Sequence, residues 1–473
     1  MKARWLALST LALSACARSE SRAPPPSHAP RAGCEFVVEE TSAEPARLAV
    51  RAHCAGPRIT GFSSADSASR GFLQITHSDP PLLAHADGFR YATAQRDVRF
   101  DYVVDLEGIA RKERRIDSAL RVGHSLIAPA STFLLQPEPL EMGVPITLAV
   151  RVPPGEDFAS GLTPVPPPGT QRYSLQAHEM SVASYSIFGH FRRETIELGA
   201  AKLVVVTADA RLDLAASVTR RWVTHSARSV AQFYGRFPMD NALVVLIPVA
   251  NRQEVVFGKV LPQSSPAIAV SLGEHVPEAT LYRDWVLVHE LFHIGFPSFD
   301  GEAKWLDEGS ATYFEPIIRA RAGDLTELEV WTEFSRQMPR GLRALEHDGL
   351  EHPSDFGAVY WGGAIACLLT DVAARTRSNG AVGLEHGFRA VLAAGGNASQ
   401  VWSLTQVSRV IDRALGAPIL AEIIEKHANA GAPVELPALF ARLGVVKNPS
   451  GAITLDDQAP WARLRHQITF GRD

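Results

Sequence analysis

The segment from Trp285 to Gly295, WVLVHELFHIG, is the feature that most constrains the fold of this chain. Apolar residues surround its two histidines and its glutamate on all sides, so a helix formed here has no polar face and must be buried. His289 and His293 are four positions apart and lie on one face of that helix, with Glu290 beside them. Buried ionisable groups cost several kcal/mol unless they are paired or bind a metal. The segment therefore predicts a buried helix that offers two imidazoles to one metal ion.

Two interpretations of this helix are open. His-Glu-x-x-His is the signature of zinc metallopeptidases, in which the glutamate is the general base. The alternative is a pair of core histidines that are satisfied by hydrogen bonds. A catalytic zinc ion takes three protein ligands and keeps one position for water, so the first interpretation requires a third ligand. Gly295 and Pro297 end the first helix where a loop must turn the chain back. The best candidate for the third ligand is Glu308, in the segment WLDEGSATY.

A second helix with the pattern W-L-x-E-G-x-A-x-Y after His-Glu-x-x-His resembles the gluzincin metallopeptidases. Within that group the chain is most similar to the glycyl aminopeptidase family, with kinship to the larger group of zinc aminopeptidases. The resemblance implies that His289, His293 and Glu308 bind one Zn²⁺ ion and that Glu290 is the general base. It also implies that Tyr360, in the segment VYWGGA, stabilises the oxyanion. Without the resemblance, the alternative for a Tyr before a pair of glycines is a packing residue. The resemblance covers roughly residues 203–377, and the β-rich part before it fits the family's N-terminal domain.

Three acids are candidates for orienting the zinc ligands. Glu315 lies two helical turns after Glu308 and could hold a ligand histidine through its free N–H group. Asp307 and Asp371 are rivals for this role. Each of the three could instead cap a helix or lie at the surface. Pro316, directly after Glu315, predicts a kink or a break in the second helix near the site.

Three departures from the aminopeptidase pattern bear on activity. Only 14 residues separate His293 from Glu308, where the aminopeptidases have about 18, so the connecting loop is short. The stretch that corresponds to the amine-binding G-x-M-E-N motif reads FGKVLP and contains no acid. Glu254 or Glu274 could substitute, and the choice between exopeptidase and endopeptidase stays open. The lysine of the family's Y-x-K-G motif is Gly362 here.

The N-terminus has the layout of a bacterial lipoprotein signal. Lys2 and Arg4 precede an apolar run that ends in LSAC at Cys16. We expect cleavage before Cys16, acylation of this residue and export to the cell envelope, and Ala17 favours the outer membrane. The chain would then face the periplasm or the cell surface. Residues 17–33 are rich in Ser, Pro and Arg, which is typical of an extended tether. A plain signal peptide with an incidental thiol is the alternative.

Residues from 34 to about 200 contain short alternating runs broken by Pro and Gly clusters, which predicts an all-β domain in the form of a sandwich. Cys34 and Cys54 lie on runs of matching parity. An exported compartment permits their oxidation, so we expect a disulfide across a hairpin, with two separate buried thiols as the alternative. Cys367 lies in an apolar helical run and is predicted to be a core residue. From residue 201 the pattern predicts a small sheet that leads into a helical body.

The expected architecture is an α+β multidomain protein. Residues 1–15 are a signal peptide, 16–33 the lipidated cysteine and its tether, and 34–200 the β sandwich. Residues 201–473 are a thermolysin-like, mainly helical zinc peptidase domain with a small sheet. A formal net charge of −4 provides no positive field for nucleic acid.

The expected function is zinc-dependent hydrolysis of a peptide or protein substrate in the cell envelope, by a protein that a lipid anchor holds in the membrane. The alternatives are a catalytically inactive peptide-binding scaffold and a glycan-binding sandwich with a degenerate partner domain. The sequence does not predict an oligomeric state.

Overall fold

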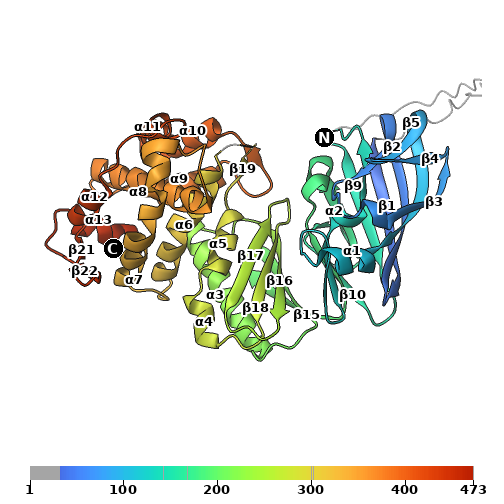
Figure 1. Ribbon diagram of the computed structural model, residues 1–473, viewed down its shortest axis with the longest axis horizontal. Coiled ribbons are helices and arrows are strands. Elements are labelled where there is room, and N and C mark those ends of the chain that lie inside the picture. The colour runs from blue at the N-terminus through green and yellow to red at the C-terminus, as the bar shows by residue number, and fades with distance from the viewer. Residues whose placement is uncertain (1–31, 142, 168, 300, 302, 472–473) are drawn as a thin grey trace, which may run out of the picture.

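The computed structural model describes residues 32–471 apart from residues 142, 168, 300 and 302. The predicted signal peptide, the lipidated Cys16 and most of the tether therefore lie outside the described residues. Figure 1 shows a β domain at one end of the molecule, a second sheet in the middle and a helical body at the other end.

The N-terminal domain is a sandwich of two sheets, as the sequence predicts. A nine-stranded sheet has the order β11-β12-β9-β1-β2-β5-β3, with β4 paired to β5 and β8 paired to β2. Its strands are β1 (Gly33–Ala43), β2 (Ala46–Ser64), β3 (Leu73–Asp79), β4 (Leu82–His85), β5 (Gly88–Asp105), β8 (Leu135–Glu138), β9 (Pro145–Arg151), β11 (Thr163–Pro164) and β12 (Arg172–Gln176). Cys34 and Cys54 face each other across the β1–β2 hairpin and form a disulfide.

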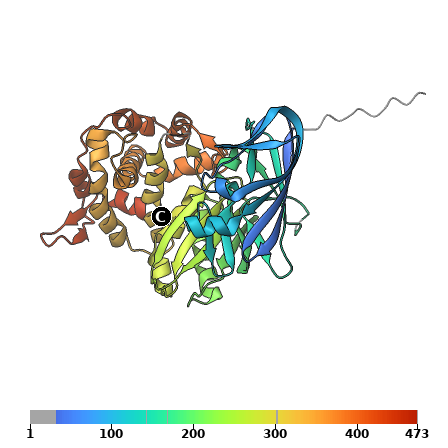
Figure 2. The same cartoon turned by 45° about the vertical axis from the view of Figure 1, so that its right-hand side comes forward.

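The second sheet of the sandwich is buried on both faces. Its order is β10-β13-β7-β6, formed by β6 (Leu120–Val122), β7 (Ser125–Pro129), β10 (Asp157–Ser160) and β13 (Tyr185–Gly189). Leu126 and Phe188 on one face join the core of the sandwich. Ile127 and Ile187 on the other face pack against the sheet of the next domain. All five residues of β7 and of β13 are buried for this reason, and Figure 2 shows the two parts of the molecule in contact.

The middle sheet has the order β14-β15-β16-β18-β17. It consists of β14 (Phe191–Leu198), β15 (Ala201–Ala208), β16 (Asn241–Val249), β17 (Val255–Leu261) and β18 (Ala267–Gly273). The three central strands are parallel, and β14 and β17 are antiparallel edges. β14 lies before residue 201, so this sheet begins earlier than the sequence-based division of the chain. β17 has no counterpart among the strands that the sequence predicts.

Helices cover the face of the middle sheet that is turned away from the sandwich. The helices in contact with its strands are α3 (Ala216–Tyr234) and α5 (Val286–His293). The helical body beyond them contains α4 (Glu278–Arg283), α6 (Lys304–Arg321), α7 (Glu327–Gln337), α8 (Phe356–Arg377), α9 (Leu384–Ala393), α10 (Leu404–Leu415), α11 (Ile419–His427), α12 (Leu436–Arg442) and α13 (Ala462–Phe470). The shorter elements are η1 (Arg70–Phe72), α1 (Leu106–Glu113), α2 (Ala130–Phe133), η2 (Ala177–Val182), η3 (Met338–Gly341), η4 (Ala344–Asp348), β19 (Ser298–Phe299), β20 (Val401–Trp402), β21 (Val445–Lys447) and β22 (Ile453–Leu455).

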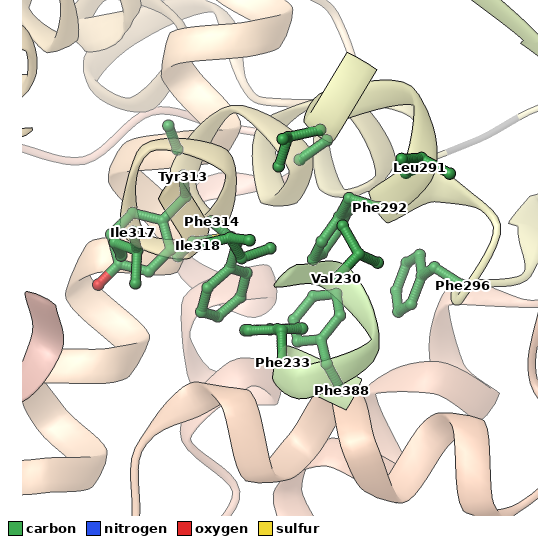
Figure 3. Packing of buried hydrophobic residues seen from close by; sticks show 14 of the residues in the cluster. Val230, Phe233, Leu291, Phe292, Phe296, Tyr313, Phe314, Ile317, Ile318 and Phe388 are labelled. Carbon is green, nitrogen blue, oxygen red and sulfur yellow. The ribbon is translucent and has the colours of Figure 1, made fainter. Parts of the chain in front are cut away.

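An aromatic cluster holds α5 against its neighbours. Phe292 of α5 lies 5.7 Å from Phe314 of α6 and 5.6 Å from Phe388 of α9, measured between ring centroids. Phe233 of α3 lies 4.8 Å from Phe314, and Figure 3 shows these rings packed between the helices. Buried rings of this size dominate the energetics of a core. The helix that carries the His-Glu-x-x-His segment is therefore packed against three different helices, α3, α6 and α9.

Helix α8 runs through the middle of the helical body. By length and composition alone it could cross a membrane, but 67% of its most apolar stretch is buried inside the protein. Cys367 on this helix is buried, as the sequence predicts. Pro316 lies inside α6, which continues past it to Arg321, so of the predicted kink or break the helix does not show the break. The neighbouring helices bury this part of α6 on all sides, and tertiary packing outweighs the hydrogen bond that proline removes.

Candidate metal centre and cleft

Three side chains from α5 and α6 meet at one point. Nε2 of His289 lies 3.3 Å from Oε2 of Glu308, and Nε2 of His293 lies 3.5 Å from the same oxygen. The potential ligand atoms of the three residues all lie within 4.8 Å of one another. His289 and His293 are 2% and 9% exposed. The two segments that the sequence singles out for metal binding are thus brought together in the structure.

The short connection between α5 and α6 still returns Glu308 to the histidines. Ala303, just before α6, adopts a left-handed backbone conformation with φ of 65°. The side chain of Glu351 then anchors the start of the helix, because Oε2 accepts a hydrogen bond from the backbone N–H of Ala303 and Oε1 accepts one from the indole of Trp305. Glu351 is 46 residues from Trp305 in sequence, so no local pattern could have identified this role.

Of the three acids proposed to orient the zinc ligands, Asp307 contacts a candidate ligand, His293. Its Oδ1 lies 2.8 Å from Nδ1 of His293, which leaves Nε2 of this ring facing Glu308. Burial would lower the pKa of His293, but the charges and hydrogen bonds of Asp307 and Glu308 raise it well above its usual range. A carboxylate in this position fixes the orientation of a ligand imidazole and raises its basicity.

Glu315 and Asp371 lie elsewhere. Both carboxylate oxygens of Glu315 accept hydrogen bonds from Arg319, at 2.7 and 2.8 Å. Asp371 accepts from the hydroxyl of Tyr313 at 2.9 Å and from Arg375 at 2.9 Å. Neither acid has a hydrogen bond to His289 or His293 among the contacts that the described residues make. Each belongs to a buried ion pair of the helical body.

Glu290 is held between α5 and the edge strand β17. Glu290 is 8% exposed, and its Oε2 accepts a hydrogen bond of 2.9 Å from the backbone N–H of Val260. Burial raises the pKa of Glu290, although the nearby histidines lower it. Gly258 permits this approach, since a Cβ there would lie 2.3 Å from Val286 and 3.0 Å from Cγ of Glu290. The carboxylate of Glu290 is therefore held beside the candidate metal ligands by a strand that sequence patterns did not predict.

Tyr360 of α8 lies over His289 and Glu308 because α6 and α8 cross very closely. A Cβ on Gly309 would lie 2.3 Å from Cα of Gly363, and a Cβ on Gly363 would lie 1.8 Å from the carbonyl oxygen of Trp305. The ring of Tyr360 stacks on that of His289 with 6.0 Å between centroids. Burial and the charge of Glu308 raise the pKa of Tyr360. Its hydroxyl therefore stays protonated and can donate a hydrogen bond into the cleft.

We expect the Gly363→Ala substitution to destabilise the protein by about 1–3 kcal/mol, because the added methyl group meets backbone rather than a movable side chain. It should also lower activity, since it separates α8 from α6 and moves Tyr360 away from Glu308. Thermal unfolding and peptide hydrolysis measure the two effects. Gly71→Ala is the matched control, because a Cβ at that position meets nothing within 4 Å. Equal stability of the two variants would contradict the close crossing.

The donor set fits a zinc ion. Two imidazoles and one carboxylate are the ligands of many catalytic zinc sites, which keep a further position for water. The Nε2 atoms of both histidines face Glu308, and Asp307 holds the far side of one ring, which is the orientation that ligation requires. Asp213, Glu274 and His275 also lie close together, but Arg211 pairs with both acids there.

Two cavities flank the three residues. One, of about 450 Å³, lies between the edge strand and α5 and is lined by Gly258, Val260, Glu290, His293 and Glu308 among others. The second, of about 340 Å³, opens beside His289 towards α7. Tyr360 and Phe356 line both cavities and mark where they meet. An extended chain laid across this point would pass directly over the metal ligands and Glu290.

Neither acid suggested as an amine-binding substitute lines these cavities. Glu254 pairs with Arg252, and Glu274 pairs with Arg211. The cavity at the edge strand contains Lys259 instead, whose Nζ lies 2.6 Å from Oδ1 of Asp117 in the N-terminal domain. The edge strand thus presents a cation, paired across the domain boundary, where the aminopeptidase pattern has an acid.

Comparisons with known proteins show that the fold of this chain is similar to that of solved structures. No protein-family model matches the sequence, and no curated protein does. Among solved structures, an aminopeptidase N family protein from Idiomarina loihiensis superposes with a TM-score of 0.68 at 13% identity, covering 90% of this chain and 82% of that one. An M1 zinc metallopeptidase mutant from Deinococcus radiodurans, bound to a Tyr-Ser-Ala substrate, gives a TM-score of 0.54 at 14% identity, covering 85% and 95%.

A two-domain M1 zinc metallopeptidase mutant bound to L-arginine gives a TM-score of 0.54 at 15% identity, again covering 85% of this chain and 95% of that one. Both domains of the chain are therefore matched together in these superpositions. The predicted gluzincin resemblance and the predicted fold class are confirmed at the level of the fold.

Proposed function

We propose that this chain, which has the fold of the M1 zinc metallopeptidases, is a zinc-dependent peptidase. The observation that carries the proposal is the convergence of His289, His293 and Glu308 in a cleft that also contains a buried Glu290 and the hydroxyl of Tyr360. A zinc ion held by the three ligands would lower the pKa of a water molecule and polarise a peptide carbonyl.

The chain's own residues supply the proton transfers and the orientation. Glu290 takes a proton from the attacking water and later gives it to the leaving amine, and its raised pKa suits a group that must do both. Tyr360 donates a hydrogen bond to the carbonyl oxygen as negative charge develops there. Asp307 keeps the ring of His293 in place. The outer edge of β17, apart from the Val260 N–H that contacts Glu290, offers backbone groups to an extended substrate.

Replacing Tyr360 by Phe is expected to lower kcat by about 10²- to 10³-fold, which is the typical cost of losing one oxyanion donor. KM should change little, because the hydroxyl acts on charge that exists only in the transition state. Steady-state kinetics on a cleaved peptide measure both constants. Tyr173→Phe, which removes a hydroxyl in the N-terminal sandwich, is the control. A Tyr360→Phe enzyme with unchanged kcat would remove this residue from the mechanism.

The experiment that tests the proposal is product mapping by mass spectrometry. A mixed library of free and N-acetylated peptides is incubated with zinc-loaded protein, and the Glu290→Gln variant is the blank. Release of single N-terminal residues from free peptides alone would establish an aminopeptidase, with an amine-binding group other than Glu254 or Glu274. Internal cleavage in both sets would establish an endopeptidase. No cleavage above the blank would contradict the proposal and favour the inactive peptide-binding scaffold.

Peptides are the substrate class that the neighbours support, because one solved M1 mutant is bound to a Tyr-Ser-Ala substrate and two others are bound to the amino acids L-arginine and L-tryptophan. The short loop that motivates the scaffold alternative does not separate Glu308 from the histidines.

We further propose that the enzyme works in the cell envelope as a lipoprotein anchored through Cys16. Membrane fractionation of the Cys16→Ser variant tests this location, and retention of the variant in the membrane fraction would contradict it.

A further inference from the structure

The cavity beside His289 differs in character from the one at the edge strand. Trp285 and Trp361 form part of its wall, and Phe356 stands at its mouth with 74% of its surface exposed. Trp285 is also 45% exposed. Large aromatic side chains are seldom left this open, and around a cavity they form walls against which a long side chain can pack.

The inner end of this cavity contains two carboxylates, Glu315 and Glu333. Glu315 is already satisfied by two hydrogen bonds from Arg319, whose remaining Nη1 donates to the carbonyl oxygen of Arg283. Glu333 on α7 makes no hydrogen bond or ion pair with any residue that the structure describes. A partly buried carboxylate without a partner is costly, and a donor that enters the cavity would supply one.

The charge balance at this inner end is negative. Asp284, Glu315 and Glu333 all lie close enough to Arg319 to interact with its charge, and among the described residues Arg319 is the cation that they share. Burial raises the pKa of Glu315 to about 7 even though Arg319 lowers it, and the charge of Glu333 adds to the rise. Arg340 also lines the cavity, but it is exposed at the rim, where water and salt screen its charge.

We propose that this cavity is the subsite for a lysine or arginine side chain next to the scissile bond, with Glu333 as the residue that determines this specificity. The aromatic walls would hold the aliphatic stem or the guanidinium plane, and the ammonium or guanidinium group would reach Glu333. The inference rests on the proposed peptidase function for its biological meaning. Its binding step can be measured without turnover.

The test uses zinc-loaded Glu290→Gln protein, which binds peptides without cleaving them if the proposed mechanism holds. Calorimetry measures the affinity for N-acetylated pentapeptides in which one position carries lysine, acetyl-lysine, norleucine or glutamate. Each of the five positions is varied in turn. At one position, lysine should bind about tenfold or more tightly than norleucine and acetyl-lysine, because a charged hydrogen bond is added. Adding the Glu333→Gln change should reduce this ratio to about 1 while the norleucine affinity stays the same.

Unchanged affinity for the norleucine peptide shows that the cavity of the Glu333→Gln variant is still folded. The acetyl-lysine peptide tests the positive charge of lysine without any change in the cavity. Glu425→Gln, which removes an exposed charge from α11, is the matched control and should leave the ratio as it is. Equal binding of lysine and norleucine, an unaltered ratio in Glu333→Gln, or no binding of any peptide at millimolar concentration would overturn the inference. If Glu290→Gln bound lysine peptides selectively but the protein with Glu290 cleaved no peptide, the peptidase proposal would be contradicted and the inference about the cavity would stand.

Discussion

The Glu290→Gln variant is expected to lose peptidase activity by about 10²- to 10⁴-fold, the usual contribution of a general base. The amide has the size of the carboxylate, and its oxygen can still accept the hydrogen bond from Val260, so the side chain should stay in place. It cannot accept a proton from water. Zinc content should be unchanged, because Glu290 is not among the three residues whose ligand atoms converge. Peptide hydrolysis and elemental analysis of the same sample give the two readings.

The two readings separate the possible roles of this residue. Full activity in Glu290→Gln would show that another group accepts the proton. Loss of zinc together with activity would show that Glu290 is needed to build the site rather than to transfer a proton. Glu425→Gln serves again as the control for removing one negative charge from the protein surface.

The Glu308→Ala variant is expected to lose zinc. Without this carboxylate only two imidazoles remain of the three ligands that a catalytic zinc site requires. The loss of affinity should exceed the 10- to 100-fold that is typical when a residue that merely orients a ligand is removed. Competition with a chelator of known affinity measures it, and circular dichroism reports whether the apoprotein keeps its fold. Activity should fall in proportion to the zinc that is lost.

Asp307→Asn is the matched comparison, since Asp307 lies next to Glu308 in sequence and contacts Nδ1 of His293 instead of facing both Nε2 atoms. Its zinc affinity should fall by only about 10- to 100-fold. If Glu308→Ala kept its zinc while Asp307→Asn lost it, the third ligand would be Asp307. If both variants kept zinc, the site would have a ligand outside these two positions.

Much of the candidate site could be predicted because it depends on spacing within single helices. His289 and His293 share a face of α5 through their four-residue separation, and burial of the helix follows from the apolar residues around them. The matching parity of Cys34 and Cys54 placed them opposite each other, as they are in the β1–β2 register. Each of these predictions compares residues that are close together in the sequence.

Other features of the site depend on segments far apart in sequence. Glu351 anchors the start of α6 from 46 residues away, and the contact between Gly309 and Gly363 sets how closely α6 and α8 cross. The edge strand β17 was not predicted, because Gly258 and Lys259 interrupt its apolar residues and a register shift between Val255 and Phe257 breaks its alternation. It is ordered by pairing with β18 on one side and by the contact of Gly258 and Val260 with Glu290 on the other.

The sequence by itself determined which side chains could bind a metal, which segment must be buried and where the β-rich N-terminal part of the chain lies. Hydrophobic periodicity and residue chemistry act locally, so they can be recognised without knowing what each element packs against. Only the tertiary structure decided that Asp307 supports His293 while Glu315 and Asp371 belong to ion pairs elsewhere, and that Glu333 faces a cavity without a partner. An acid on a helix has the same local signature in all these roles, and its partner is chosen by the packing of distant helices.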